Sequence, residues 1–276
     1  MKLISRGERK VKRKLDHSVI IKVDRVSKSF SNKGQTEQVL HKVSFELKKG
    51  EIISILGESG CGKSTLLNVI GGFEKADSGR VLLDGHIVER PSRRCVMLFQ
   101  NYGLLPWRSV LKNVELGLED QANIPANERR ERAFHYLRLV GLNDKANLFP
   151  HQLSGGMQQR VALARALVIQ PELILMDEPF AALDTFNRYY LQDELLRLQD
   201  KEKTTIILVT HDIDEAIYLS DRILIMSANP GRIRKEIKIN TSRPRDRSHQ
   251  DFQHFRKIIF EEFHFNRPAQ PMEYSI

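Results

Sequence analysis

Residues 57–65 read GESGCGKST, directly after the apolar run EIISIL and directly before the helix-like run LLNVIGG. They contain the pattern G-x-x-x-x-G-K-[ST] at Gly57, Gly62, Lys63 and Ser64. A strand before this pattern and a helix after it are the context in which it binds phosphate. Its glycines let backbone N–H groups turn toward phosphate oxygens, and the helix N-terminus adds favourable partial charge. The sequence therefore predicts a nucleotide phosphate site here; a plain glycine-rich turn is the alternative.

The residue types in this loop have separate predicted tasks. Lys63 is expected to act catalytically by reaching the β- and γ-phosphates, and the Ser64 hydroxyl to ligate Mg²⁺. We interpret Cys61 as a small filler rather than as a site of redox control. The residues predicted to contact the nucleotide are Gly57, Glu58, Ser59, Gly60, Cys61, Gly62, Lys63, Ser64 and Thr65.

Two later apolar runs end in residues that suit a metal ion and a general base. LILM, at 173–176, precedes Asp177 and Glu178, and TIILVT, at 205–210, precedes His211. Such runs are typical of strands buried in a parallel sheet, whose carboxyl ends carry active groups. A carboxylate there is costly unless it pairs with a cation, so Asp177 is a predicted Mg²⁺ ligand. Glu178 is predicted to polarise an attacking water, and His211 to contact the γ-phosphate or orient that water.

The composition is that of a folded protein with a sizeable core. The chain has 276 residues, of which 41% are apolar, enough for one large domain or two small ones. No stretch is apolar and long enough to span a membrane, and the basic N-terminus lacks the apolar run of a signal peptide. The two cysteines, Cys61 and Cys95, cannot build a disulfide framework, and free thiols suit a reducing compartment. We therefore expect a cytosolic protein.

The formal net charge of +9 is concentrated in two places. Residues 1–14 hold seven Lys or Arg and one acidic residue, and residues 232–247 hold seven and two. The body of the chain is slightly acidic, which argues against a nucleic-acid surface there. We interpret the N-terminal arm as a solvated tail, with contact to nucleic acid or anionic lipid as the alternative.

The order of the apolar patterns predicts an α/β protein. The runs VIIKVDRV, VSFEL, EIISIL and RVLLDG predict strands. Residues 101–165 carry charge-rich helical patterns such as NERRERAFHYLRLVGL. Near the C-terminus, apolar residues recur at spacings of three and four, which predicts one amphipathic helix. Packing on its own domain is favoured over contact with a membrane, and docking on a partner subunit is left open.

Residues 153–160 read LSGGMQQR and open another predicted helix. Ser154, with Gly155 and Gly156, makes a second helix N-terminus suited to an anion. One nucleotide does not need two such cradles from one chain. The economical interpretation is a head-to-tail dimer with a second copy of the chain, in which each cradle completes the partner's site around two sandwiched ATP molecules.

The set GESGCGKST, Gln100, LSGGMQQR, LILMDEP, ALD and His211 resembles the ATP-binding cassette (ABC) ATPases in their order. The resemblance implies a P-loop NTPase with a RecA-like core, an antiparallel β subdomain and an inserted helical subdomain at about residues 101–165. The predicted division is a basic, disordered tail at 1–18, the ATPase domain at 19–240 and a C-terminal extension with an amphipathic helix at 241–276.

Three further residues take roles from this resemblance. Gln100 resembles the glutamine that senses Mg²⁺ and links the two subdomains, and Asp184 resembles the aspartate of the dimer contact. Phe30, 27 positions before Gly57, resembles the aromatic residue that stacks on adenine; a core or edge residue is the alternative. In this family, hydrolysis is coupled to opening of the dimer. The predicted metal set is Ser64, Gln100 and Asp177, and the predicted catalytic set is Lys63, Glu178 and His211.

Two functional classes fit these motifs, the motor subunit of a membrane transporter and a soluble ATPase of translation or DNA maintenance. A non-catalytic nucleotide-binding module is disfavoured because Glu178 and His211 are both present. Translation members usually carry two cassettes in one chain, and this chain has one. DNA-maintenance members split the cassette with a long coiled coil, whereas only 54 positions separate Gln100 from Ser154. The sequence favours a peripheral transporter subunit at the cytoplasmic face of the membrane, with permease subunits, an extracytoplasmic solute-binding protein and no nucleic acid as partners.

Four patterns, FQNYGLLPWRSVLKNV, EPFAALDTFNR, RILIMSANPGRI and RPRDR, are similar to the nitrate/sulfonate/taurine/bicarbonate importer cassettes. This similarity implies uptake of a small oxyanion-type solute, and taurine and aliphatic-sulfonate cassettes are the most similar. The cassette does not touch the solute, which other subunits select, so residue chemistry in this chain does not identify it.

The stretch GLLPW, at residues 103–107, contains the only tryptophan of the chain. In the cassettes that this chain resembles, the segment after Gln100 lies at the groove that receives a short helix of the permease. The resemblance therefore implies a docking site at Leu104, Leu105 and Trp107, stiffened by Pro106. Packing inside the helical subdomain is the alternative, with Leu104 as its first candidate.

Overall fold

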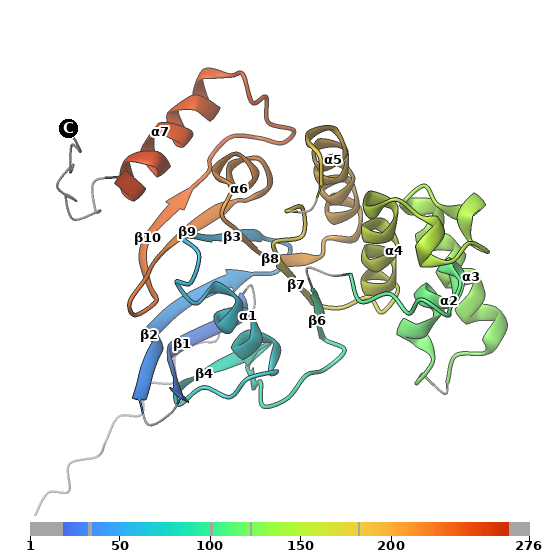
Figure 1. Ribbon diagram of the computed structural model, residues 1–276, viewed down its shortest axis with the longest axis horizontal. Helices are drawn as coiled ribbons and strands as arrows, with labels where there is room; N and C mark the ends of the chain where they lie inside the picture. The colour runs from blue at the N-terminus through green and yellow to red at the C-terminus, as the bar shows by residue number, and fades with distance from the viewer. Residues whose placement is uncertain (1–18, 33–34, 100–101, 122, 182, 265–276) are drawn as a thin grey trace, which may run out of the picture.

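The computed structural model describes residues 19–32, 35–99, 102–121, 123–181 and 183–264. Its elements form two β-sheets with helices between and around them, and a separate group of helices at one end (Figure 1). The strands are β1 (Val19–Asn32), β2 (Gln35–Lys48), β3 (Ile52–Gly57), β4 (Ser78–Leu83), β5 (His86–Ile87), β6 (Cys95–Leu98), β7 (Leu173–Asp177), β8 (Thr205–Thr210), β9 (Arg222–Ser227) and β10 (Arg232–Lys238). The helices are α1 (Lys63–Gly71), α2 (Val110–Glu115), α3 (Ala126–Leu139), α4 (Gly155–Leu167), α5 (Thr185–Glu202), α6 (Ile213–Leu219) and α7 (Gln250–His264), with 3₁₀ turns η1 (Leu116–Leu118), η2 (Asn143–Lys145) and η3 (Pro150–Gln152).

The larger sheet has the strand order β10-β9-β3-β8-β7-β6. All its neighbours are parallel except β10, which pairs antiparallel with β9. Every residue of β3 and β8 is buried, as expected for central strands covered on both faces. The predicted buried parallel strands are confirmed. The carboxyl ends of β3, β8 and β7 therefore meet at one edge.

The two faces of this sheet belong to different cores. Ile53 and Ile55 of β3 pack with α1 and the smaller sheet, whereas Ile52 and Leu56 pack with residues of the helices on the other face. This alternation follows from the two-residue period of a strand. The smaller sheet, β2-β1-β4-β5, is antiparallel throughout and covers α1 from the other side.

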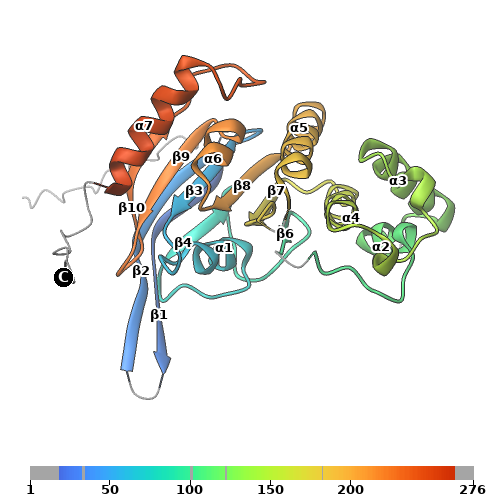
Figure 2. The ribbon, with the colours of Figure 1, turned by 45° about the horizontal axis from the view of Figure 1, so that its top comes forward.

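Helices α2, α3 and α4 contact one another and lie together beyond β6 and β7 (Figure 1, Figure 2). They share a buried core to which Val110, Leu137 and Val161 contribute from the three helices. Helix α4 also contacts β6 and α5, so it connects this group to the larger sheet.

The final helix, α7, packs against α6 of the same chain. Phe252 and Ile259 are buried in its contact face, and Phe255 and Phe263 are partly buried beside them. Their spacing places them on one side of the helix. Among the residues that the structure describes, no helix combines the length and the apolar character needed to cross a membrane.

Candidate nucleotide-binding and catalytic site

The loop between β3 and α1 wraps around the side chain of Lys63. Its Nζ donates hydrogen bonds to the carbonyl oxygens of Gly57 at 2.8 Å and Glu58 at 2.9 Å, and the side chain is buried. Gly62 caps α1 with a φ of 95°, and a Cβ there would approach the Leu40 side chain to 2.9 Å. Both the left-handed backbone and the close approach require glycine at this position. The turn therefore holds the positively charged Lys63 ammonium group at the start of α1.

Cys61 lies behind this loop, with 1% of its surface exposed. Its Sγ is the atom that a Cβ at Gly57 would meet first, at 2.7 Å. Burial raises the pKa of the Cys61 thiol, and a protonated, buried thiol is a poor nucleophile. The side chain fills the space under the loop, so only backbone atoms of Cys61 can face a phosphate.

Asp177, at the end of β7, forms a hydrogen bond with Ser64 of the phosphate loop. Burial raises its pKa, while a hydrogen bond with Ser64 and the charge of Lys63 act in the opposite direction. Its register partner is Val209 of β8, the next strand in the sheet. The parallel sheet thus brings a residue 113 positions further along the chain to the hydroxyl of Ser64.

Glu178 and His211 face each other at the same edge. The Nδ1 atom of His211 lies 3.2 Å from Oε1 of Glu178. The Glu178 N–H donates to the Val209 carbonyl, and its φ of 46° is in the left-handed region, where a residue with a side chain is under strain. The Glu178 side chain is 27% exposed and the His211 side chain is 62% exposed. The carboxylate is therefore directed by the end of β8 and remains open to solvent.

These residues suit a nucleotide with a magnesium ion. The Ser64 hydroxyl and the Asp177 carboxylate are oxygen donors of the kind that Mg²⁺ prefers. A Cβ at Gly60 would have no described atom within 4 Å, so the loop backbone has open space on that side. Lys63, although its Nζ is bound to carbonyls, lies one residue from Ser64 and supplies positive charge for phosphate oxygens.

A buried polar cluster beneath this edge was missed by sequence reasoning. Glu215 of α6 is 6% exposed, accepts a hydrogen bond from Thr210 Oγ1 at 3.1 Å and donates its N–H to Asp212. Burial, more than its charged neighbours, raises its pKa to about 8. Arg188 of α5 pairs with Asp212 at 3.1 Å. The spacing of Glu215 to Leu219 on the same helix face is the signal that would have indicated its burial.

The second glycine-rich turn lies elsewhere. Ser154 caps α4 by accepting a hydrogen bond from the Met157 N–H at 3.4 Å, and Gly155 is exposed. Strands β6 and β7 lie between α4 and α1 in both views (Figure 1, Figure 2). Asp184 caps α5 in the same way, accepting from Phe186 N and Asn187 N, both at 3.1 Å. The structure therefore does not bring these two residues to the loop of their own chain.

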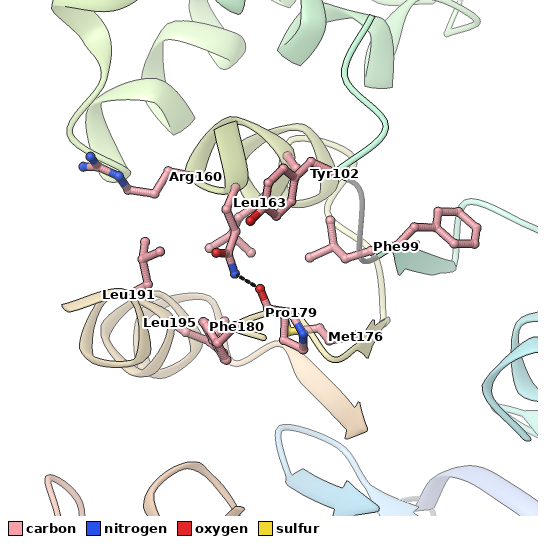
Figure 3. A pocket seen from close by; sticks show the side chains of 12 residues that line it. Phe99, Tyr102, Arg160, Leu163, Met176, Pro179, Phe180, Leu191 and Leu195 are labelled. Carbon is pink, nitrogen blue, oxygen red and sulfur yellow. Dashed lines mark hydrogen bonds between the residues drawn. The ribbon is translucent and has the colours of Figure 1, made fainter. Parts of the chain in front are cut away.

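Gln100 lies outside the described residues, but the segments flanking it form a joint between the two parts of the protein. Arg165 of α4 donates to the carbonyl oxygens of Tyr102 and Gly103, both at 2.7 Å. Gln159 of α4 donates to the Pro179 carbonyl at 2.5 Å. A small apolar cavity of about 30 Å³ lies here, with Tyr102 and Leu163 on one side and Met176, Pro179 and Phe180 on the other (Figure 3).

Two predicted contact residues are surface side chains. Phe30 on β1 is 42% exposed, with Lys28 Nζ 5.0 Å from its ring centroid. Trp107 is 72% exposed, whereas Leu104 packs against the core. The alternative that this stretch packs inside the helical subdomain is therefore wrong for Trp107 and holds for Leu104.

Comparison with known proteins identifies the family. The model of the ABC transporter family matches residues 40–181. An uncharacterised ABC transporter ATP-binding protein of Methanocaldococcus jannaschii is 48% identical over 90% of this chain and 93% of its own length. The aliphatic sulfonates import ATP-binding protein of Bacillus cereus is 43% identical over 88% and 95%, and the taurine import ATP-binding protein of Rhizobium johnstonii is 46% identical over 78% and 82%.

A solved structure shows the same fold. A dimeric ATP-binding cassette in a post-hydrolysis state, bound to ADP and Pi, superposes with a TM-score of 0.72 at 35% identity, over 81% of this chain and all of that one. The predicted P-loop fold with its antiparallel β subdomain and inserted helices is confirmed, as is the preference for a transporter ATPase over a soluble one. The chain belongs to the ABC transporter family and is one of its ATP-binding, ATP-hydrolysing cassettes.

Proposed function

We propose that this cassette drives uptake of a small oxyanion-type solute, with aliphatic sulfonates and taurine as the first candidates. The names of two relatives, an aliphatic sulfonates import protein and a taurine import protein, support this solute class. The observation that carries the catalytic part is the meeting of Ser64, Asp177, Glu178 and His211 at one sheet edge.

The proposed chemistry divides the work among these residues. Lys63 and the loop N–H groups bind the phosphates. Ser64 and Asp177 would hold Mg²⁺, which neutralises charge on the phosphate oxygens when it is bound. Glu178, oriented by the strained turn at the end of β7, accepts the proton of the attacking water. His211, 3.2 Å from Glu178, holds the carboxylate and that water in line.

A second copy of the chain is the proposed partner at Ser154. The first backbone N–H groups of a helix have no carbonyl partner within it, so the N-terminus of α4 suits an anion, which its partial charge also favours. Because its own phosphate loop lies across β6 and β7, the nucleotide that this end binds belongs to another copy. Asp184, which begins α5 and lies beside Asn187 near Gly156, is the proposed second contact with that copy.

The proposed permease contact is Trp107, which is 72% exposed and belongs to the segment that Arg165 ties to α4. An exposed aromatic side chain beside Pro106 is typical of a docking point for a partner helix. Such a contact places the subunit at the cytoplasmic face of the membrane without a spanning segment of its own. An extracytoplasmic solute-binding protein completes the proposed importer.

The experiment is reconstitution of the cassette with its permease subunits in lipid vesicles that contain ATP, with the binding protein outside. We expect ATP-dependent uptake of labelled taurine or an alkanesulfonate. Trp107→Ala should reduce assembly and uptake while the isolated subunit keeps its ATPase rate and thermal stability. Phe260→Ala, which also removes an exposed aromatic ring, is the control and should transport normally. Unchanged uptake in Trp107→Ala would remove the docking assignment.

A further inference from the structure

The RPRDR segment, residues 243–247, connects β10 to α7 and contains a buried guanidinium group. Arg245 is 7% exposed. Its Nη1 donates to the carbonyl oxygens of Ile217 at 2.7 Å, Tyr218 at 3.1 Å and Ser220 at 2.7 Å. These are carbonyls at the C-terminal end of α6, which lack partners within the helix. A cation at this end also interacts favourably with the helix dipole.

The other two nitrogen atoms of the Arg245 guanidinium group bind Thr241, in the same connection between β10 and α7. Nε donates to the Thr241 side chain at 3.0 Å and Nη2 to the Thr241 carbonyl at 3.1 Å. Burial lowers the pKa of Arg245 to about 10, so the side chain remains charged at neutral pH. Arg245 therefore joins the C-terminal extension to α6 by hydrogen bonds that a smaller side chain cannot replace.

Two neighbouring arginines extend this attachment. The Arg247 guanidinium lies 3.6 Å from the ring centroid of Tyr218 on α6 and 3.9 Å from that of Tyr189 on α5. Arg256 of α7 pairs with Asp214, in the first turn of α6, at 3.0 Å. The extension thus contacts both ends of α6, the C-terminal end through Arg245 and the N-terminal end through Arg256.

Helix α6 begins two residues after His211. Its seven residues are too few to form a stable helix alone, so tertiary contacts set its position. At its start, Asp212 accepts a hydrogen bond from the Glu215 N–H at 3.0 Å, which fixes the turn that carries His211. Movement of α6 along or about its axis therefore moves His211 relative to Glu178.

We propose that Arg245 is a positioning residue for ATP hydrolysis: by holding the C-terminus of α6 it sets the place of His211 against Glu178. The proposal rests on the role given to His211 above. It assigns the C-terminal extension a task in turnover, beyond packing. Arg256 acts on the same helix from its other end. Arg247 supports both by joining the segment to α5.

The test compares Arg245→Met and Arg245→Lys with the unaltered full-length chain. For Arg245→Met we expect kcat to fall about tenfold through misplacement of His211, while the KM for ATP changes less than about twofold. Arg245→Lys keeps the charge and some hydrogen-bond donors, so its kcat should lie between that of the unaltered chain and that of Arg245→Met. Amide hydrogen exchange should accelerate in residues 211–216 and stay unchanged in α1.

A double-mutant cycle with His211→Ala distinguishes the possible outcomes. If Arg245 acts through His211, adding Arg245→Met to His211→Ala should change kcat by less than about twofold. A lower melting temperature with unchanged kcat, or the full tenfold loss in the His211→Ala background, would overturn the proposal. Normal turnover of His211→Ala itself would instead refute the role of His211.

If Arg245→Met does not fold, two single variants at exposed positions of α7 answer the same question. Arg256→Gln and Lys257→Gln each remove one positive charge from exposed positions on α7, but only Arg256 pairs with Asp214. We expect Arg256→Gln to lower kcat about threefold or more and Lys257→Gln to leave it unchanged. Equal kcat in the two variants would show that the extension does not position α6 for catalysis.

Discussion

Two helices of this protein, α1 and α4, start at glycine-rich turns, and their surroundings differ. At the start of α1, Lys63 is buried against two carbonyls, and Ser64 bonds Asp177 from another strand. At the start of α4, Ser154 bonds its own helix and Gly155 is exposed. Both ends attract anions through backbone N–H groups. Among the described residues, the start of α1 has a buried lysine and a carboxylate bonded to its hydroxyl, whereas the Asp184 carboxylate near the start of α4 caps another helix.

The difference supports the proposed division of work between two copies of the chain. In the proposed function, the sheet edge at α1 holds the groups that bind phosphate and activate water. In the same proposal, the end of α4 supplies N–H groups, a hydroxyl and partial charge to a nucleotide that another copy binds. Three variants test this division, in order of decreasing expected effect on ATP binding or turnover, and a fourth tests the stability of the buried cluster beneath the α1 edge.

The largest effect is expected from Glu178→Gln. Loss of the general base should lower kcat about 100-fold or more, whereas ATP affinity should remain because the amide keeps the shape of the side chain. Phosphate release measures the rate and calorimetry the affinity. Glu131→Gln, at an exposed position of α3, controls for loss of one acidic side chain. A rate near that of the unaltered protein would show that the α1 edge lacks the base.

Lys63→Met should weaken ATP binding by roughly 10- to 100-fold, the range expected for a charge-assisted hydrogen bond to phosphate. The buried Nζ cannot be replaced by solvent, and the Gly57 and Glu58 carbonyls lose their donor. Titration with ATP measures the affinity. Lys49→Met removes an exposed lysine and should bind normally. Equal affinities in the two variants would remove the distinction between α1 and α4.

Ser154→Asp separates capping from phosphate contact. Aspartate and asparagine cap helices about as well as serine, so thermal stability should stay nearly constant in both variants. The added negative charge should repel the γ-phosphate held by the partner and lower turnover about tenfold, while ATP binding to the monomer is unchanged. Ser154→Asn is the neutral control. Full turnover in Ser154→Asp would show that the α4 end does not face a nucleotide.

Glu215→Gln tests the buried cluster beneath the α1 edge. The folded-state pKa of Glu215, about 8, exceeds that of an exposed glutamate. Its contribution to stability is therefore complete at low pH and is lost as the pH rises through 8. Between pH 6 and pH 8 the free energy of unfolding should fall by about 2 kcal/mol more in the unaltered protein than in Glu215→Gln. Urea denaturation at pH 6 and at pH 8 measures this difference. An equal fall in the free energy of unfolding in the two proteins would refute it.

Local patterns predicted the elements whose chemistry is carried by neighbouring residues. The phosphate loop, the apolar strands before Asp177 and His211, and the cap at Ser154 each depend on fewer than ten consecutive residues, and all could be read directly. The parallel order of the strands followed from continuous apolar runs. The burial of Glu215 was not predicted, because a polar residue in a short helix is usually exposed.

Exposure and long-range contact had to come from the folded protein. In the GLLPW stretch two apolar residues differ, because Leu104 meets the core of the helical group and Trp107 does not. From the sequence, the RPRDR segment indicated only similarity to a group of importer cassettes and gave no structural role. In the structure its central arginine binds carbonyls 25 to 28 positions away.

The sequence by itself therefore determined the nucleotide chemistry and the family, because both depend on residue types at short, constant spacings. Only the tertiary structure decided which side chains face solvent, where the two helix N-termini lie and what the C-terminal arginines hold. These outcomes depend on contacts between distant segments, and such contacts are selected by packing of the whole core rather than by any local period.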